Sequence, residues 1–207
     1  MITVIGNLKG GTGKSTVAFN LSLWVATHRN VHVIVYDLDP QATLTDALEI
    51  RTEDGYSPSI TPENSVKKLG KEGEHSEIIV DIGMSDTVAM KAALKKADRV
   101  VVPVGPSQAD VWSTQRFLKL VEDACGNSKL PKVYGFINRA DTHRAIRETD
   151  EAYDALLTLS EKIEMLEPRL YQRTAYRRSF SEGMAVFELD QKSKASQEIE
   201  ELGKVLY

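Results

Sequence analysis

The sequence predicts an α/β protein with a mostly parallel, twisted sheet and helices on both faces. Short apolar runs of strand length alternate with helical patterns from one end of the chain to the other. The runs are nearly continuous and rich in β-branched residues, which is typical of strands buried on both faces. Polar and glycine-rich residues directly follow several runs, as at the carboxyl edge of a parallel sheet, where ligands bind in such folds.

Six strands are predicted from these apolar runs. They cover residues 2–5, 31–36, 77–82, 99–104, 132–138 and, as a short sixth strand, 169–171. Helical spacing predicts helices at residues 14–27, 86–96, 108–124, 145–166, 173–181 and 194–206. One-sided apolar spacing supports two of them, through Val17, Leu21, Trp24 and Val25 in the first and Val111, Gln115, Leu118 and Val121 in the third. The polar residues 51–73 predict a loop with one short helix.

Length and composition restrict the class of protein. With 207 residues, the chain has the size of one compact domain, and we expect residues 1–207 to form it. A hydrophobic fraction of 42% and a charged fraction of 27% exclude collagen-like, disordered and disulfide-scaffold classes. The net charge of −4 means that nucleic-acid binding would need a local basic patch. The apolar start lacks a signal-peptide pattern, and no stretch reaches the roughly 20 apolar residues of a membrane span, so we expect a cytoplasmic protein.

A glycine-rich segment joins the first predicted strand to the first predicted helix. It reads Asn7-Leu8-Lys9-Gly10-Gly11-Thr12-Gly13-Lys14-Ser15-Thr16. Glycines let the backbone turn tightly and point N–H groups at an anion, and the helix N-terminus adds partial positive charge. Lys14 would reach the β- and γ-phosphates of a nucleoside triphosphate, and the Ser15 hydroxyl would ligate Mg²⁺. Although Leu8 stands where the strict motif has glycine, we predict that Gly10, Gly11, Thr12, Gly13, Lys14, Ser15 and Thr16 bind phosphate.

Three aspartates follow predicted strands at the same edge of the sheet. Asp37 and Asp39 come after the second strand, and Asp81 lies near the end of the third. One such aspartate is more often a turn or helix-cap residue, but three beside a phosphate loop favour metal and water chemistry. We predict that Asp81 holds Mg²⁺ directly or through water, and that Asp37 hydrogen-bonds metal-bound water or Ser15. Asp39 is the candidate that positions the attacking water.

These residues resemble a known family. Residues 9–16 match the deviant Walker A motif, which has an additional lysine near the start of the loop. Together with residues 37–41 and 78–81, the segment resembles the ParA/MinD group of P-loop ATPases, with the motifs in the right order over about the first 140 residues. The whole length resembles the small, ParF-like partition ATPases. Because the loop begins at residue 7, we expect no helix-turn-helix before it.

The resemblance implies a cofactor and a partner. ATP and Mg²⁺ would bind at the loop, and ATP would drive formation of a homodimer. Lys9 is expected to cross into the partner subunit and touch its nucleotide, whereas the residues alone would make Lys9 a solvated lysine. Asp39 is expected to support hydrolysis, so that Lys9, Lys14 and Asp39 form the catalytic set. Residues 103–106 resemble the proline-bearing loop near the dimer face, although a rigid strand exit explains both prolines equally well.

Asn138 follows the fifth predicted strand, where the base of a nucleotide can lie. Its amide can hydrogen-bond adenine. The spacing of Asn138 and Asp141 also resembles the guanine-reading motif of GTPases. The family therefore implies ATP, whereas the local residues leave GTP open, and Asp141 can equally cap the next helix.

Arginines gather near the C-terminal end of the chain. Between Pro168 and Ser181 there is no acidic residue, and Arg173, Arg177 and Arg178 are the strongest candidates for DNA contacts. Such density suits sequence-independent binding to DNA phosphates, and the resemblance implies nonspecific DNA binding by the ATP-bound dimer. A solvated helix face is the alternative.

The last predicted helix does not suit a membrane surface. Residues 196–207 carry Glu198, Glu200 and Glu201 against Lys204, so anionic lipid would repel this segment. The single cysteine, Cys125, argues against the iron–sulfur proteins that share this kind of loop, since they need paired cysteines.

The sequence therefore predicts a weak, dimerising ATPase that associates with the nucleoid. A centromere-binding or cargo adaptor protein would stimulate hydrolysis, and the cycle would position a plasmid or another cargo. One alternative is an ATPase of the same family that positions a protein microcompartment. The other is a metabolic P-loop enzyme such as a ligase or kinase, for which the sequence shows no recognisable second-substrate residues.

Overall fold

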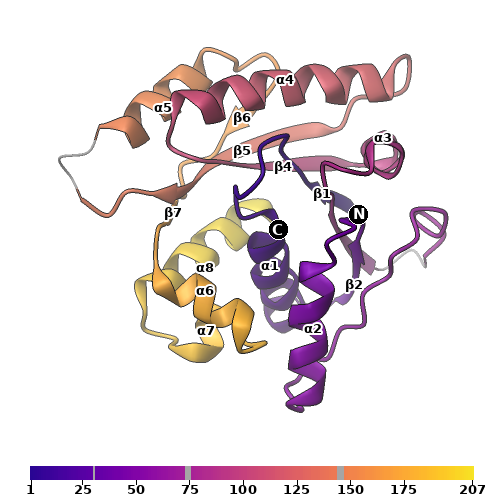
Figure 1. Cartoon of the computed structure of the whole chain (residues 1–207), viewed down its shortest axis with the longest axis vertical. Coiled ribbons are helices and arrows are strands. Elements are labelled where there is room, and N and C mark those ends of the chain that lie inside the picture. Colours follow the sequence, from indigo (N-terminus) through magenta and orange to yellow (C-terminus); the bar gives the residue numbers. More distant parts are fainter. Residues whose placement is uncertain (30, 73–75, 144–146) are drawn as a thin grey trace.

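The computed structural model describes residues 1–29, 31–72, 76–143 and 147–207 and contains a seven-stranded sheet (Figure 1). Its strands are β1 (Ile2–Ile5), β2 (His32–Asp37), β3 (Ser76–Asp81), β4 (Arg99–Val104), β5 (Lys132–Ala140), β6 (Glu164–Met165) and β7 (Leu170–Tyr171). The strand order is β2-β3-β1-β4-β5-β6, and β7 pairs separately with β5. Each of these pairings is parallel. The predicted fold class is confirmed.

Helices cover both faces of this sheet. They are α1 (Lys14–His28), α2 (Thr43–Glu53), α3 (Thr87–Lys96), α4 (Gln108–Cys125), α5 (Glu148–Leu157), α6 (Thr174–Ser181), α7 (Val186–Leu189) and α8 (Lys194–Leu206). Helices α3, α4 and α5 lie on one side of the sheet, and α1, α2, α6, α7 and α8 lie on the other (Figure 1). The described residues contain no helix long and apolar enough to cross a membrane.

The sheet separates two hydrophobic cores. Because successive side chains of a strand point to opposite faces, Val100 and Val102 of β4 join the core under α3–α5, while Val101 joins the core around α1. All six residues of β4 are buried for this reason. Helix α1 is buried almost all round between Val17 and Val25, because α2, α6 and α8 pack around it. This burial fixes the start of α1, where the phosphate loop ends.

One predicted helix is much shorter in the structure. The expected helix at 145–166 begins outside the described residues, and α5 ends at Leu157, before a turn and strand β6. The chain leaves the helix so that Ile163 and Met165 can pack over Gly135 of β5. A Cβ on Gly135 would lie 2.6 Å from a side-chain atom of each. Burial of Ile163 against the sheet therefore outweighs the helical spacing of the sequence.

Two short helices were not predicted. They are α2, of which residues 43–50 had no predicted element, and α7. The short helix expected within residues 51–73 is not found in 54–72, which contain turns and no helix. Arg51 lies fully buried in α2 and forms a bidentate ion pair with Glu188 of α7 (2.7 and 2.8 Å). Gln115, expected on the apolar face of α4, is exposed, and Phe117 is buried in the core.

Candidate nucleotide-binding site

The phosphate loop connects β1 to α1 in a conformation that requires glycine. Gly11 (φ 72°) and Gly13 (φ 85°) both have the left-handed backbone that other residues rarely adopt. Gly13 also allows a close approach, because a Cβ there would lie 2.6 Å from the amide nitrogen of Asn138. That nitrogen donates a hydrogen bond to the carbonyl of Thr12 (2.6 Å), which ties the loop to the end of β5.

Lys14 and Ser15 open α1 and face a cavity of about 380 Å³. Lys14 is 8% exposed, and its Nζ lies 3.5 Å from the carbonyl oxygen of Lys9. The cavity is lined by Gly10, Gly11, Gly13, Lys14, Ser15, Thr16, Asp39, Gln41, Thr43, Met84, Ser85 and Phe180. The structure therefore brings the predicted phosphate-binding residues, except Thr12, together with the predicted catalytic carboxylate Asp39.

The side chain of Asp81 is fully buried beside the phosphate loop. Neither of its oxygens has a hydrogen-bond partner among the described residues. Burial raises the pKa of Asp81 to about 7, with further increases from Asp37 and Asp39. Lys14 lowers it, and so does the Ser15 hydroxyl, which lies near enough to interact although it makes no well-formed hydrogen bond to Asp81. A buried carboxylate without a hydrogen-bond partner is costly, so its position beside a phosphate loop suits a cation ligand.

Asp37 lies directly opposite Asp81 in the register of β2 and β3. Its two oxygens are already used within the chain. One accepts from the backbone N–H of Asp39 (3.2 Å), and the other accepts from the backbone N–H and the hydroxyl of Thr45 (2.9 and 2.8 Å). In this structure Asp37 therefore anchors the first turn of α2, and its predicted contact with metal-bound water or Ser15 stays a prediction.

Asp39 occupies a tight position next to the loop that follows β3. One oxygen accepts the backbone N–H of Gln41 (3.0 Å). A Cβ on Gly83 would lie 2.5 Å from the carboxyl carbon of Asp39, so only glycine permits this packing. Asp39 thus faces the phosphate cavity from a fixed position, as a residue that positions water would need.

The side chain of Lys9 is held within its own chain. Its Nζ forms an ion pair with Asp110 (2.8 Å) and lies 3.4 Å from the hydroxyl of Ser107. Asp110 is buried, and a Cβ on Gly105 would lie 2.8 Å from its carboxylate, so Gly105 makes room for this acid. The Lys9 side chain remains 40% exposed, which leaves it accessible at the edge of the site.

A second cavity, which we call the base-side cavity, lies on the other side of the phosphate loop. It measures about 320 Å³ and is lined by Gly11, Gly13, Thr16, Val17, Asn138, Arg139, Leu170, Tyr171, Gln172, Arg173, Tyr176 and Arg177. Arg139 is a non-glycine residue with φ 58°, and its guanidinium donates to the Gly11 carbonyl (2.6 Å) and to Gln172 (2.8 Å). Arg139 therefore links the phosphate loop to the segment before α6.

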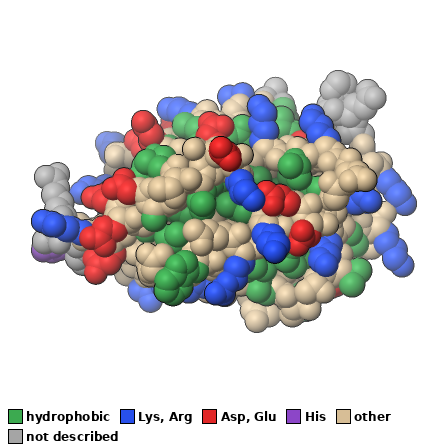
Figure 2. All heavy atoms as spheres, turned by 90° about the horizontal axis from the view of Figure 1, so that it is seen from above, with side chains coloured by type: hydrophobic (Ala, Val, Ile, Leu, Met, Phe, Trp, Pro, Cys, Tyr) green, Lys and Arg blue, Asp and Glu red, His purple; other side chains and the backbone are tan. Residues whose placement is uncertain are grey.

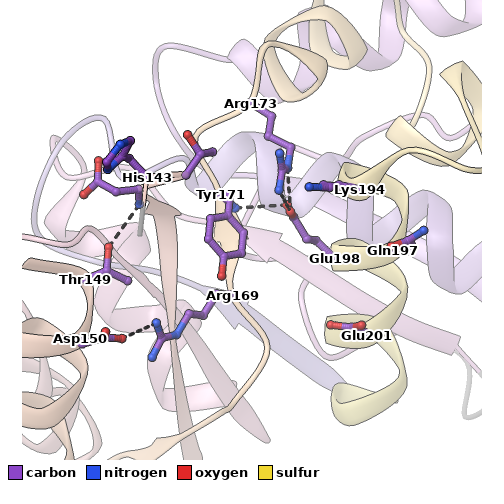
Figure 3. A pocket seen from close by; sticks show the side chains of 12 residues that line it. His143, Thr149, Asp150, Arg169, Tyr171, Arg173, Lys194, Gln197, Glu198 and Glu201 are labelled. Carbon is purple, nitrogen blue, oxygen red and sulfur yellow. Dashed lines mark hydrogen bonds and ion pairs between the residues drawn. The ribbon is translucent and has the colours of Figure 1, made fainter. Parts of the chain in front are cut away.

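Asp141 does not join Asn138 in the base-side cavity. It lines a neighbouring cavity of about 480 Å³ (Figure 3), and its backbone N–H donates to Thr149 (3.2 Å). It does not cap α5 either, because the N-cap position there is Arg147. This geometry lacks the paired Asn and Asp of a guanine-reading motif.

The sequence profile of the family described as the CobQ/CobB/MinD/ParA nucleotide binding domain matches residues 3–186. The chain belongs to this family. The predicted resemblance to ParA and MinD proteins is thereby confirmed.

Individual relatives agree with the family assignment. The chain is 25% identical to the maintenance of carboxysome distribution protein A of Halothiobacillus neapolitanus over 98% of this chain and 93% of that protein. It is 28% identical to protein ParA of Rhizobium radiobacter over 88% of this chain and 83% of that protein. A plasmid partition protein of Borrelia burgdorferi B31, solved with AMPPNP, has the same fold, with a TM-score of 0.78, 20% identity and coverage of 99% and 97%.

In this ParA/MinD family member, the predicted DNA-binding arginines divide into two groups. Arg173 and Arg177 line the base-side cavity, and Arg173 is paired with Glu198 (2.6 Å). Arg178 points elsewhere, since its side chain is 64% exposed and pairs with Glu182 one turn along α6 (2.7 Å). The DNA role of all three stays a prediction, and Arg178 is the member whose position suits it best.

Glu198 is the main residue of the site that sequence analysis missed. It was counted among exposed acids, but it is 7% exposed and hydrogen-bonded to residues that line the base-side cavity. The helical spacing of Glu198 relative to the apolar residues of α8 could have predicted its burial. The buried positions of α8 are Ala195, Ser196, Glu198, Ile199, Leu202, Gly203 and Leu206, so Glu198 lies on the apolar face of that helix.

Proposed function

We propose that this chain is an Mg²⁺-dependent ATPase that forms a dimer when ATP is bound and positions a DNA or protein cargo through an adaptor. One observation carries the proposal. Lys14, Ser15 and Asp39 share one cavity beside the glycine loop, and Asn138 lines a second cavity on the other side of the same loop. A nucleoside triphosphate lying across the loop would place its phosphates in the first cavity and its base in the second.

The hydrogen bonds of Asn138 favour adenine. Its amide nitrogen donates to the carbonyl of Thr12 (2.6 Å), which leaves the carbonyl oxygen of the same side chain to face a ligand as an acceptor. An acceptor at this position suits the exocyclic amino group of adenine and opposes the carbonyl oxygen that guanine carries there. This supports ATP over GTP.

The residues present fit Mg²⁺ only together with the nucleotide. The described residues contain no group of three His, Cys, Asp or Glu side chains that could hold a metal by themselves. The Ser15 hydroxyl and the unpaired Asp81 carboxylate would hold the ion with phosphate oxygens and water. When bound, Mg²⁺ would neutralise charge that develops on the phosphates. Asp37, whose oxygens are engaged with Thr45 and Asp39, would act by orienting α2.

Hydrolysis then requires positioned water and positive charge. Asp39 would hold the attacking water as a hydrogen-bond acceptor, because it faces the phosphate cavity and Gly83 fixes its place. Lys14 and the loop N–H groups would stabilise negative charge on the γ-phosphoryl group as it leaves. Among the described residues that line the phosphate cavity, Asp39 is the single carboxylate and none is a histidine, which suits slow basal turnover that an adaptor accelerates.

Lys9 would change partner when the dimer forms. In this structure it binds Asp110 of its own chain, and its exposed position allows it to reach a nucleotide held by a second copy. Each subunit would exchange one ion pair for contact with the other subunit's phosphates. The γ-phosphate would thereby favour the dimer, and hydrolysis would remove that preference.

Nonspecific DNA would bind on the side of the sheet that carries α6. On the face formed by α3–α5, basic and acidic side chains are interspersed (Figure 2), which is unlike a DNA-binding surface of one sign. Arg178, the exposed arginine of the predicted set that does not line the base-side cavity, lies on α6 on the opposite side of the sheet. Such contacts would hold the ATP dimer on the nucleoid.

The cargo can be argued only from relatives. Protein ParA of R. radiobacter and the B. burgdorferi partition protein favour a plasmid with a centromere-binding adaptor. The H. neapolitanus relative, which matches 98% of this chain, favours a second candidate, a carboxysome or similar protein body.

Sedimentation tests the proposed cycle. The protein is examined with ADP and with a nonhydrolysable ATP analogue, each with and without linear DNA. We expect dimers and DNA co-sedimentation with the analogue only. Hydrolysis that needs a small-molecule acceptor and ignores DNA would instead identify a metabolic P-loop enzyme.

A further inference from the structure

The outer wall of the base-side cavity is formed by a segment that needs external support. Tyr171, Arg173 and Tyr176 all line this cavity. They come from the end of β7, the loop after it and the first turn of α6. Strand β7 has only two residues, so its pairing with β5 contributes few hydrogen bonds. Contacts from another element must therefore hold these side chains in place.

One carboxylate of α8, that of Glu198, binds all three of these residues, and Figure 3 shows its contacts with Tyr171 and Arg173. Glu198 accepts hydrogen bonds from the backbone N–H of Tyr171 (3.1 Å), from Nε of Arg173 (2.7 Å) and from the Tyr176 hydroxyl (2.9 Å). Nη2 of Arg173 lies 2.6 Å from the oxygen that accepts from Nε, which completes the ion pair. The Arg173 guanidinium also lies over the Tyr171 ring, 5.2 Å from its centroid. The three wall residues are thus one unit centred on Glu198.

The charge and burial of Glu198 make this unit specific. A buried carboxylate accepts several hydrogen bonds at once, including a forked pair from arginine, whereas an amide at the same place has only one accepting oxygen. Burial and Glu198 together raise the pKa of Tyr176 far above its usual range, so its hydroxyl remains a donor. Glu198 itself is absent from the lining of the base-side cavity.

We infer that Glu198 is a positioning residue for the nucleotide base. It would act through Tyr171, Arg173 and Tyr176 to keep the base-side cavity shaped for adenine, without touching the nucleotide. The inference rests on the proposed function, because it assumes that the base of ATP occupies this cavity. The inference also predicts that binding of the phosphates does not depend on Glu198.

Two ligands separate these effects. Calorimetric titration measures the Kd of Mg²⁺–ATP and of inorganic tripolyphosphate with Mg²⁺, which has phosphates but no base. The parent is compared with Glu198→Gln and with Glu201→Gln, which removes the same charge from an exposed position on the same helix. We expect Glu198→Gln to weaken ATP binding about tenfold and to leave tripolyphosphate binding unchanged. The control should change neither.

Other outcomes overturn the inference. ATP binding by Glu198→Gln as tight as in the parent would do so, as would an equal loss for both ligands, which indicates a general structural role. A parent that binds tripolyphosphate but not ATP would overturn this inference and leave the phosphate site intact. A parent that binds neither would overturn the proposed function as well.

Tyr176→Phe provides a second variant if Glu198→Gln does not fold, as judged by thermal melting. It keeps the ring and removes one donor to Glu198. We expect about threefold weaker ATP binding with unchanged tripolyphosphate binding. An ATP affinity equal to that of the parent would contradict the role of Glu198.

Discussion

The two sides of the proposed nucleotide site are built in different ways. The phosphate side uses ten consecutive residues, 7–16, and aspartates at the ends of two adjacent strands. The base side combines Asn138, the segment 170–177 and Glu198, which are far apart in the sequence. An anion can be bound by backbone N–H groups and one lysine, so a short segment suffices. A planar base needs side chains on several sides, and these come from segments that only the tertiary structure brings together.

The largest expected effect lies on the phosphate side. Lys14→Ala removes the buried ammonium of the phosphate cavity and should reduce ATP turnover about a hundredfold or more. Binding of tripolyphosphate should fall with that of ATP, in contrast to Glu198→Gln. Calorimetry and steady-state phosphate release measure both quantities. Unchanged turnover would refute the assignment of the phosphate loop.

Asp39→Ala should separate binding from hydrolysis within the phosphate side. We expect ATP to bind normally and turnover to fall about a hundredfold, because the attacking water loses its acceptor. The variant should therefore accumulate as the ATP-bound dimer, measurable by sedimentation with ATP itself. Normal turnover would move the catalytic role to another carboxylate.

The phosphate side was largely predictable because its residues are local. The sequence analysis named Gly10–Ser15, Asp39 and Asp81 as site residues. The structure places Asp39 in one cavity with most of the loop, and Asp81 within reach of Lys14 and Ser15, while their roles with a nucleotide stay predictions. The sequence analysis missed the use of Asp37 by Thr45 and the ion pair of Lys9 with Asp110, since each depends on how separate elements pack. The same limit applies to the fold. The strands of the sheet core were identified, whereas β6 depends on a contact between Ile163 and Gly135 that spacing does not encode.

Asp81→Asn tests whether the buried carboxylate of Asp81 destabilises the nucleotide-free protein. The folded protein holds a proton on Asp81 up to about pH 7, whereas the ordinary value is 3.8. The free energy of unfolding of the nucleotide-free parent should therefore fall as pH rises from 3.8 to about 7.

The variant should lack this contribution and melt at a higher temperature than the parent at pH 7.5, while Mg²⁺-dependent turnover falls. Thermal melts over a pH series measure the effect. Identical pH dependence in the parent and the variant would show that Asp81 titrates normally.

The smallest expected effect concerns the arginines next to the base side. Arg178→Glu should weaken DNA retention by the analogue-bound protein and reduce the slope of log affinity against log salt by about one. Lys129→Glu, the same charge reversal at an exposed residue after α4, is the matched control. DNA binding measured over a salt series compares them. Equal retention by both variants would place the DNA surface elsewhere.

Arg51 has a consequence for how the molecule can move. Its guanidinium joins α2 to the carbonyl of Gly183 (2.9 Å) and to Glu188, and it is completely enclosed. Separating these segments would strand a charge in the interior, which is prohibitive on the scale of ordinary thermal fluctuations. Thr45, in the first turn of α2, donates to Asp37, so a displacement of Asp37 would move α2 together with the segment between α6 and α7.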